Sequence, residues 1–263
     1  MLSHNTISFI KSLHQKKKRN EHGLFIAEGD KLVRELLASH LVVREVYALI
    51  DWLREYGNLL NDEIKTAGVT QPELERISTL VTAPPVLAIV QIPEQEIAME
   101  ELFGGYTLVL DAIRDPGNMG TIIRTADWFG INRIIASDDC AEHWNPKVVQ
   151  ASMGSLTRVK IVNKDLNKFF TELNAVSHSK NMDMPAVYGT YMGGQSIYNE
   201  TFAPSGLIVI GNESNGIRST TEQFIDRKIA VPCFAAEGDS KPESLNAALA
   251  TALVLSEVRR TRG

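Results

Sequence analysis

Three turns of this sequence combine glycine with uncharged amide side chains, and each follows a short apolar run. They span Ala112–Gly120, Gly211–Gly216 and Cys233–Asn246. Glycine lets a ligand approach the main chain, and exposed N–H groups in such turns can bind acceptor atoms. Turns between strands and helices also favour Gly, Asn, Ser and Asp without any ligand. Residue types alone therefore leave two interpretations open, a ligand-binding edge and a set of ordinary turns.

The first of these turns leads into a predicted helix, Gly120–Phe129, that carries an arginine on its polar side. At about 100° per residue, Arg124 points away from the apolar face that contains Ile122 and Ala126. A guanidinium group is planar, always charged and able to grip a phosphate through two hydrogen bonds. The plainer alternative, an exposed arginine that pairs with Asp127, stays open at this point.

Other chemistries lack their sequence signatures. No GxGxxG follows a predicted strand, and neither GxxxxGK[ST] nor GxSxG occurs. The usual dinucleotide site, the P-loop and the serine-hydrolase elbow therefore lose support. The six histidines are scattered, and no Cys/His pair has the spacing of metal ligands. We expect no metal site.

The elements that must position these turns follow a regular alternation from residue 106 onward. The predicted strands are Thr107–Leu110, Arg133–Ala136, Arg158–Val162, Ala186–Tyr191, Leu207–Ile210 and Lys228–Val231. The predicted helices are Gly120–Phe129, Pro146–Leu156, Leu166–Leu173, Thr220–Phe224 and Ser244–Arg260. This pattern is typical of a parallel α/β sheet with helices on both faces. Ligands bind at the carboxyl edge of such sheets, where the three turns should meet.

The first third of the chain reads as a separate small α/β unit. Its predicted strands are Gly23–Glu28, Val43–Leu49 and Val86–Val90, and its predicted helices are Ile7–Lys17, Asp30–Ala38, Trp52–Leu59 and Gln71–Ser78. The acidic, proline-bearing segment Gln91–Glu101 reads as the linker between the two parts.

Composition sets the class of protein. The chain has 263 residues, 44% of them hydrophobic, two cysteines and a net charge of −5. These values are ordinary for a globular protein, and the cysteine content favours a reducing compartment. No signal peptide and no apolar run of about 18 residues is found, so we expect a cytoplasmic protein. The basic run Lys16–Arg19 is either a solvated face or a patch that contacts phosphates.

Three motifs resemble those of the SpoU-type, TrmH-like RNA ribose 2′-O-methyltransferases of the SPOUT superfamily. The first, Asn118–Ala126, matches N-x-G-x-x-x-R, and the second, Ile210–Gly216, matches G-x-E-x-x-G. The third consists of Val231-Pro232 followed by Ser244-Leu245-Asn246, with a longer intervening loop than is usual. The three occur in the family's order, and the resemblance covers about residues 105–260. The first third is similar to the small L30e-like substrate-binding domain that many members carry.

The resemblance implies an α/β SPOUT fold with a C-terminal trefoil knot. Its domains would be an L30e-like RNA-binding domain at 1–98 and a methyltransferase domain at 99–263. It implies S-adenosyl-L-methionine as methyl donor and a homodimer formed through the knotted domain. The substrate would be a ribose 2′-hydroxyl in structured RNA, with ribosomal RNA preferred over transfer RNA. Two other classes stay open, a non-catalytic RNA-binding protein on the same scaffold and a small-molecule α/β enzyme.

The resemblance also implies roles for individual residues. Arg124 would contact the target ribose or its phosphate and stabilise the forming alkoxide. Asn118 and Glu213 would hold the first two motif loops together, and Ser244 and Asn246 would position the target or the start of the helix. These four residues and Arg124 would form the catalytic set. The donor pocket would be lined by Thr190, Gly211, Val231, Pro232, Leu245 and Asn246. The residues that would bind RNA are Lys16, Lys17, Lys18 and Arg19, together with Arg124.

Overall fold

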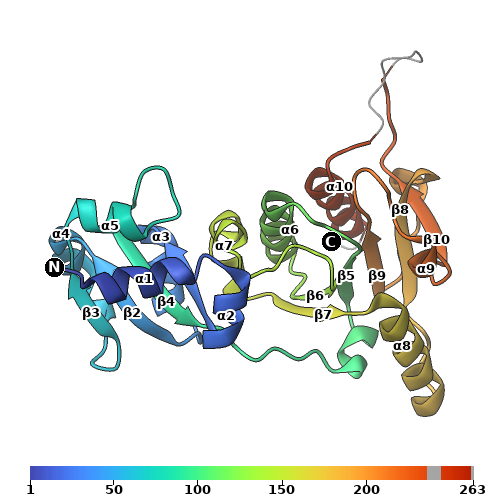
Figure 1. Ribbon diagram of the computed structural model, residues 1–263. Helices are drawn as coiled ribbons and strands as arrows, with labels where there is room; N and C mark the ends of the chain where they lie inside the picture. The colour runs from blue at the N-terminus through green and yellow to red at the C-terminus, as the bar shows by residue number, and fades with distance from the viewer. Residues whose placement is uncertain (236–243, 262–263) are drawn as a thin grey trace. The chain divides into compact units, whose positions relative to one another are not determined.

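The computed structural model describes residues 1–235 and 244–261 and divides into two compact units (Figure 1). The first unit comprises Met1–Glu94 together with Glu142–Thr157. The second comprises Gln95–Ala141 together with Arg158–Gly263. The predicted loop between Pro232 and Ser244 lies largely outside the described residues.

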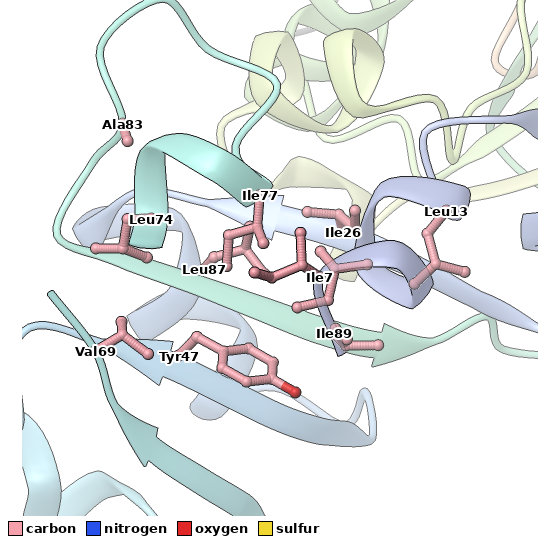
Figure 2. Packing of buried hydrophobic residues seen from close by; sticks show 11 residues of the cluster. Ile7, Leu13, Ile26, Tyr47, Val69, Leu74, Ile77, Ala83, Leu87 and Ile89 are labelled. Carbon is pink, nitrogen blue, oxygen red and sulfur yellow. The ribbon is translucent and has the colours of Figure 1, made fainter. Parts of the chain in front are cut away.

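The first unit is a four-stranded mixed sheet with order β1-β4-β2-β3, in which β1 and β2 both run antiparallel to β4. Its strands are β1 (Leu24–Glu28), β2 (Val43–Ala48), β3 (Lys65–Gly68) and β4 (Val86–Gln91). Its helices are α1 (His4–Ser12), α2 (Lys16–His22), α3 (Asp30–Leu37), α4 (Ile50–Tyr56), η1 (Gly57–Leu59), α5 (Gln71–Ile77), α7 (Pro146–Ser152) and η3 (Ser155–Thr157). Apolar residues of α1, α5 and the sheet form one buried cluster (Figure 2).

Two elements of this unit differ from the sequence prediction. The single helix predicted over Ile7–Lys17 is two helices, since α1 ends at Ser12 and α2 starts at Lys16. The main-chain oxygens of Leu13 and His14, which the break leaves without helical partners, accept hydrogen bonds of 2.9 and 2.8 Å from Arg19 Nη1. The strand β3 was missed because it is short and carries none of the apolar alternation that marks a strand.

Glu73 of α5 provides a pH-dependent contact in this unit. Its carboxylate accepts hydrogen bonds from the main-chain N–H of Thr70 at 2.9 Å and of Leu2 at 2.5 Å. These bonds, with the Thr70 side chain, lower the pKa of Glu73 from 4.5 to about 2. The stabilisation is thus fully present above pH 4.5 and is lost as the pH falls toward 2.

We therefore expect Glu73→Gln to flatten the pH dependence of stability between pH 4.5 and 2. Urea unfolding at several pH values measures this. The exposed Glu75 lies on the same helix, and Glu75→Gln serves as the control. An unchanged slope in Glu73→Gln would show that the folded state does not hold the Glu73 carboxylate in its charged form.

The second unit is a six-stranded sheet with order β10-β8-β9-β5-β6-β7, in which every pair of neighbours is parallel. Its strands are β5 (Tyr106–Leu110), β6 (Arg133–Ser137), β7 (Lys160–Lys164), β8 (Ala186–Ser196), β9 (Gly206–Ile210) and β10 (Arg227–Ala230). Its helices are η2 (Met99–Phe103), α6 (Pro116–Trp128), α8 (Leu166–Lys180), η4 (Ile197–Asn199), α9 (Ser219–Glu222) and α10 (Ala247–Arg260). The predicted parallel sheet is confirmed. Of the helices predicted between its strands, Pro146–Leu156 instead belongs to the first unit, as α7 and η3.

Both central strands of this sheet, β5 and β9, are buried along their whole length. Side chains of α8, including Phe169, Phe170 and Leu173, pack with Val109 and Val209 in one apolar cluster. The helices α6 and α10 contact each other. A central parallel strand needs cover on both faces, which explains why these strands read as unbroken apolar runs.

Candidate active site

A cavity of about 620 Å³ lies in the second unit at the carboxyl ends of β8, β9 and β10. Four chain segments line it, namely residues 190–193 of β8, the loop after β9, the end of β10, and the start of α10 with the residues before it. The cavity combines the apolar side chains of Ile210, Ile229 and Leu245 with the main chain of Gly193 and Gly211. Its size falls in the range of small-ligand sites.

The three sequence motifs meet beside this cavity. Asn118 Nδ2 donates a hydrogen bond to Glu213 Oε1, and Asn118 Oδ1 accepts one of 2.8 Å from Asn246 Nδ2. The main-chain N–H of Ala247 donates to the same Glu213 oxygen over 3.4 Å. Residues separated by about a hundred positions in the chain therefore form one connected polar group, as the resemblance implied for Asn118 and Glu213.

Helix caps place two of these side chains. Asp115 caps α6 by accepting a 2.8 Å hydrogen bond from the main-chain N–H of Asn118, and Pro116 occupies the first turn. Asn246 caps α10 through Oδ1, which accepts from the N–H groups of Ala248 and Leu249 at 3.0 and 3.2 Å. Because Oδ1 is used for the cap, Nδ2 of Asn246 is left to contact Asn118.

The loop after β9 is closed tightly on itself. Asn212 and Gly216 exchange main-chain hydrogen bonds of 3.1 and 2.8 Å. A Cβ atom on Gly211 would lie 2.4 Å from the carbonyl carbon of Gly216, so no larger residue fits at position 211. This closure turns Glu213 toward Asn118 and leaves the main chain of the loop at the cavity wall.

Most of the residues predicted for the donor pocket lie at the cavity. Thr190, Gly211, Val231 and Leu245 line it, and so does Ser244, which we predicted as catalytic. Pro232 and Asn246 are adjacent in sequence to lining residues but are not part of the wall. The Thr190 hydroxyl donates a hydrogen bond of 3.2 Å to the carbonyl of Val209, so this hydroxyl links β8 to β9.

The sequence prediction missed one wall of the cavity, formed by Tyr191, Met192 and Gly193. The pairing of β8 with β10 moves from Gly189 directly to Gln195, so residues 190–194 bulge out of the ladder. A Cβ atom on Gly194 would come within 2.6 Å of the Ile229 main chain. The pair Gly193-Gly194 was the available signal, because adjacent glycines in a strand often mark a bulge or a close main-chain approach.

Arg124 lies on the exposed side of α6, as its helical position predicted. It is not part of the cavity wall, and it lies six residues beyond Asn118, or about 9 Å along the helix axis. Within residues 1–235 and 244–261 it has no ion-pair or hydrogen-bonding partner. The alternative of an Arg124–Asp127 pair is therefore wrong, since Asp127 pairs with Arg158 at 2.8 Å.

The basic run divides into exposed and buried members. Lys16 and Lys17 are exposed, and Lys18 pairs with Glu21 at 2.8 Å. Arg19 is only 1% exposed and forms a two-point ion pair with Glu142. The prediction that Arg19 contacts RNA is corrected here, because its guanidinium is enclosed and already bonded.

Tyr191, in the cavity wall, has a strongly shifted pKa. Burial, and then the charges of Glu222 and Asp111, raise the pKa of Tyr191 to about 12, so this phenol stays protonated at neutral pH. Among the residues that the structure describes, no cluster of three or more His, Cys, Asp or Glu side chains could hold a metal ion. Both cysteines, Cys140 and Cys233, are free thiols.

Comparisons with known proteins agree with this geometry. The sequence profile described as the SpoU rRNA Methylase family matches residues 105–256. The chain belongs to this family. A second profile, the MRM3-like substrate binding domain, matches residues 4–88. The second unit accordingly has the fold of the SPOUT methyltransferases, preceded by a substrate-binding domain.

Relatives of this SpoU methylase cover nearly its full length. The 23S rRNA (guanosine(2553)-2′-O)-methyltransferase RlmP of Bacillus subtilis is 29% identical over 95% of this chain and 94% of its own. A Porphyromonas gingivalis structure assigned to the TrmH family of RNA methyltransferases has a TM-score of 0.83 and 34% identity, with 99% of each chain covered. The SpoU methyltransferase AviRb of Streptomyces viridochromogenes, solved with S-adenosylmethionine, shares the fold with a TM-score of 0.84 and 24% identity, over 99% of this chain and 98% of its own.

The cavity of this SpoU methylase fits such a donor. Its apolar walls suit the faces of an adenine ring, and the main chain of the tight Gly211–Gly216 loop offers hydrogen-bonding groups for the ring edge and ribose. Glu213 is the one acidic side chain in the described wall, and its charge complements a positively charged ligand. The residues present therefore match the shape and charge of S-adenosylmethionine.

Proposed function

We propose that this protein transfers a methyl group from S-adenosylmethionine to a ribose 2′-hydroxyl of ribosomal RNA. The observation that carries the proposal is the hydrogen-bonded group of Asn118, Glu213 and Asn246 at the edge of the 620 Å³ cavity. It joins all three family motifs at the place where an α/β sheet binds its ligand. When bound, S-adenosylmethionine supplies an electrophilic methyl group.

The residues of the site have separate roles in this proposal. Gly211, Val231 and Leu245 form the part of the cavity wall that binds the donor, and the hydrogen bond between Asn118 and Glu213 holds the first two motif loops together. Arg124 stays charged and stabilises negative charge that develops on the 2′-oxygen. Holding the hydroxyl in line for attack supplies a further large part of the rate.

The first unit selects the RNA in this proposal. The match of residues 4–88 to a substrate-binding profile supports an RNA-binding domain at 1–98 and a catalytic domain at 99–263. The exposed Lys16 and Lys17, with Lys18, are the proposed phosphate contacts of this domain. Segment Glu142–Thr157 is an exception within 99–263, since it packs with the first unit and would contribute to the RNA-binding domain.

A homodimer is part of the same proposal. On α10, Leu249 and Leu253 lie one turn apart with 56% and 40% of their surface exposed, and Trp128 on α6 is 86% exposed. An apolar surface of this kind next to a ligand cavity is typical of an interface. Leu245 is exposed and also lines the cavity, so the second copy would sit close to the donor.

We therefore expect Leu249→Asp combined with Leu253→Asp to yield a monomer, because paired carboxylates would oppose burial of this face. Light scattering coupled to size-exclusion chromatography measures the mass. Val42→Asp, which changes an exposed apolar residue of the first unit, is the matched control. If the wild type itself has the mass of one chain, the proposed dimer is wrong.

The proposal also includes a trefoil knot and a cytoplasmic location. A trefoil knot is supported by the contact of Ala247 with Glu213 and of α10 with α6, which bring the C-terminal segment against earlier loops. A cytoplasmic location is supported by the two free thiols. No helix among the described residues has both the length and the apolar character needed to cross a membrane.

The test is methyl transfer to total RNA from cells that lack this gene, with labelled S-adenosylmethionine. We expect the label in the RNA of the large ribosomal subunit, since the Bacillus relative is named for 23S rRNA. Label in transfer RNA would replace ribosomal RNA as the substrate. Binding of RNA without any transfer, to free RNA or to ribosomal subunits, would favour a non-catalytic RNA-binding protein.

A further inference from the structure

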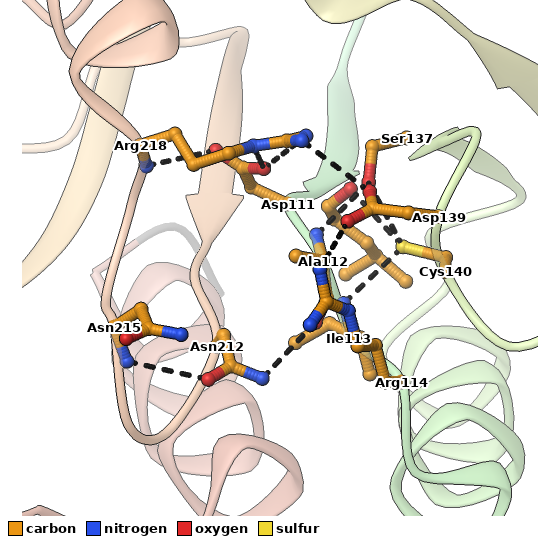
Figure 3. A network of polar contacts seen from close by, with 11 residues as sticks. Asp111, Ala112, Ile113, Arg114, Ser137, Asp139, Cys140, Asn212, Asn215 and Arg218 are labelled. Carbon is orange, nitrogen blue, oxygen red and sulfur yellow. Dashed lines mark hydrogen bonds and ion pairs between the residues drawn. The ribbon is translucent and has the colours of Figure 1, made fainter.

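A buried carboxylate, Asp111, forms an ion pair with the partly exposed Arg218, at the end of the loop that carries Glu213. Asp111, the residue directly after β5, is fully buried, and three nitrogens of one partner, Arg218, contact its carboxylate (Figure 3). Arg218 donates hydrogen bonds from Nε at 2.6 Å and from its main-chain N–H at 3.0 Å, and its Nη2 completes the ion pair at 2.5 Å. A carboxylate without access to water requires such a partner, since an unpaired buried charge is strongly destabilising.

The position of Arg218 in the chain means that its ion pair with Asp111 holds one end of a loop. Arg218 ends the loop that starts at Gly211, and Asp111 begins the turn that leads to Asn118. A second contact crosses the same gap, since Asn212 Nδ2 donates to the carbonyl of Ala112 over 3.1 Å. The loop is thus held at both of its ends, by Asn212 and Arg218, to the turn that precedes the first motif, and Glu213 lies between these two contacts.

The turn that follows Asp111 is also held in place by hydrogen bonds. Ala112 has φ of 60°, a conformation that residues with a side chain rarely adopt. Its N–H donates to Ser137 Oγ at 2.9 Å, and the N–H of Ile113 donates to Cys140 Sγ at 3.3 Å. Such a conformation persists only where its surroundings fix it. Asp111 therefore offers Arg218 a rigid anchor.

An alternative reading of Arg218 is a cation that grips the RNA backbone. Its side chain is 43% exposed, and Arg114 nearby is 66% exposed. Both guanidinium groups, however, are matched by carboxylates, because Asp139 pairs with Arg114 at 2.8 Å and lies 3.4 Å from Arg218. With Asp111 the four charges sum to zero, so the cluster has little net attraction for a phosphate.

We infer that Asp111 and Arg218 are positioning residues for the donor site, in which the buried carboxylate fixes Arg218 and thereby the loop that presents Glu213 and the main chain of the cavity wall. This inference rests on the proposed function for its effect on methyl transfer. Arginine is required rather than a cation in general, since lysine cannot donate from two nitrogens in a fixed fork to one carboxylate oxygen.

The test uses the full chain with Arg218→Lys, Arg218→Gln and Asp111→Asn, and Arg114→Gln as the matched control. Titration with S-adenosylmethionine alone should show at least about a tenfold loss of affinity in the first three variants, a size typical of a lost charged hydrogen bond. Amide hydrogen exchange in residues 212–217 should accelerate in the same variants and not in the control. Because Arg218 is partly exposed, its two variants decide the question even if Asp111→Asn does not fold.

The salt dependence of binding to purified large-subunit ribosomal RNA separates the two readings. We expect the slope in Arg218→Lys and Arg218→Gln to equal that of the wild type. Unchanged donor affinity and exchange, with a slope in Arg218→Gln smaller by about one, would overturn the inference and make Arg218 a phosphate contact. Full rescue by lysine, or an equal loss of donor affinity in Arg114→Gln, would overturn it as well. Exchange is measured without donor or RNA, so it tests the positioning even if the wild type transfers no methyl group.

Discussion

Arg124→Ala is expected to lower the rate of methyl transfer by about two to three orders of magnitude, the usual effect of removing a group that stabilises an oxyanion. Affinity for S-adenosylmethionine should stay within about twofold of the wild type, because Arg124 is not part of the cavity wall. Single-turnover transfer and donor titration, on the same protein preparation, measure the two quantities.

Two variants sharpen the test of Arg124. Arg124→Lys keeps the charge but not the planar fork, so we expect it to recover only part of the activity. Lys168→Ala removes another exposed cation of the second unit, on α8, and should transfer normally. An Arg124→Ala protein that loses donor binding and turnover equally would contradict this division of roles, and so would one that keeps full activity.

Arg19→Met is expected to destabilise the first unit by about 3 kcal/mol, because it leaves Glu142 without its charged partner in a largely enclosed place. The change also removes two donors to the carbonyls of Leu13 and His14. Urea unfolding followed by tryptophan fluorescence measures the loss. Trp144, which packs against Phe25 in the same unit at a centroid distance of 4.7 Å, is a suitable reporter.

Lys17→Met is the matched control for Arg19→Met, since it removes an exposed cation two positions away. Its stability should stay within about 0.5 kcal/mol of the wild type. A stable Arg19→Met protein that binds RNA poorly would contradict the structural role of Arg19 and return it to the RNA-binding patch.

The burial of Arg19 could not be predicted from the sequence. Four consecutive basic residues share a pattern, and nothing local distinguishes the last of them from the others. The difference arises from Glu142, which lies 123 residues later in the chain. Burial that depends on such a distant partner has no signature within a short window of sequence.

Arg124 and the sheet were predictable for the opposite reason. The strands β5 and β9 are short apolar runs, and the outward direction of Arg124 follows from helical periodicity within α6. The meeting of Asn118 with Asn246 required more, since periodicity places each on its own element only. The family motifs predicted that Asn118 would lie beside Glu213, but the 2.8 Å contact of Asn118 with Asn246 across 128 residues was not predicted.

The cavity wall formed by residues 190–193 could not be predicted from sequence, because it depends on how β8 pairs with a distant strand. Sequence alternation ended the strand at Tyr191, whereas β8 continues to Ser196 after the bulge. The bulge exists because β10 pairs with β8 on both sides of it, and β10 lies more than thirty residues further along the chain. Two adjacent glycines hinted at this irregularity but did not specify which strand approaches them.

In the proposed function, the three motif loops form a site that methylates a ribose oxygen. The most direct measurement is mass spectrometry of nucleosides, after the purified protein has reacted with isotope-labelled S-adenosylmethionine and RNA from cells that lack the gene. We predict labelled methyl on the 2′-oxygen of one nucleoside, absent with Arg124→Ala. Labelled methyl on a base, with no labelled 2′-O-methyl nucleoside, would contradict the account.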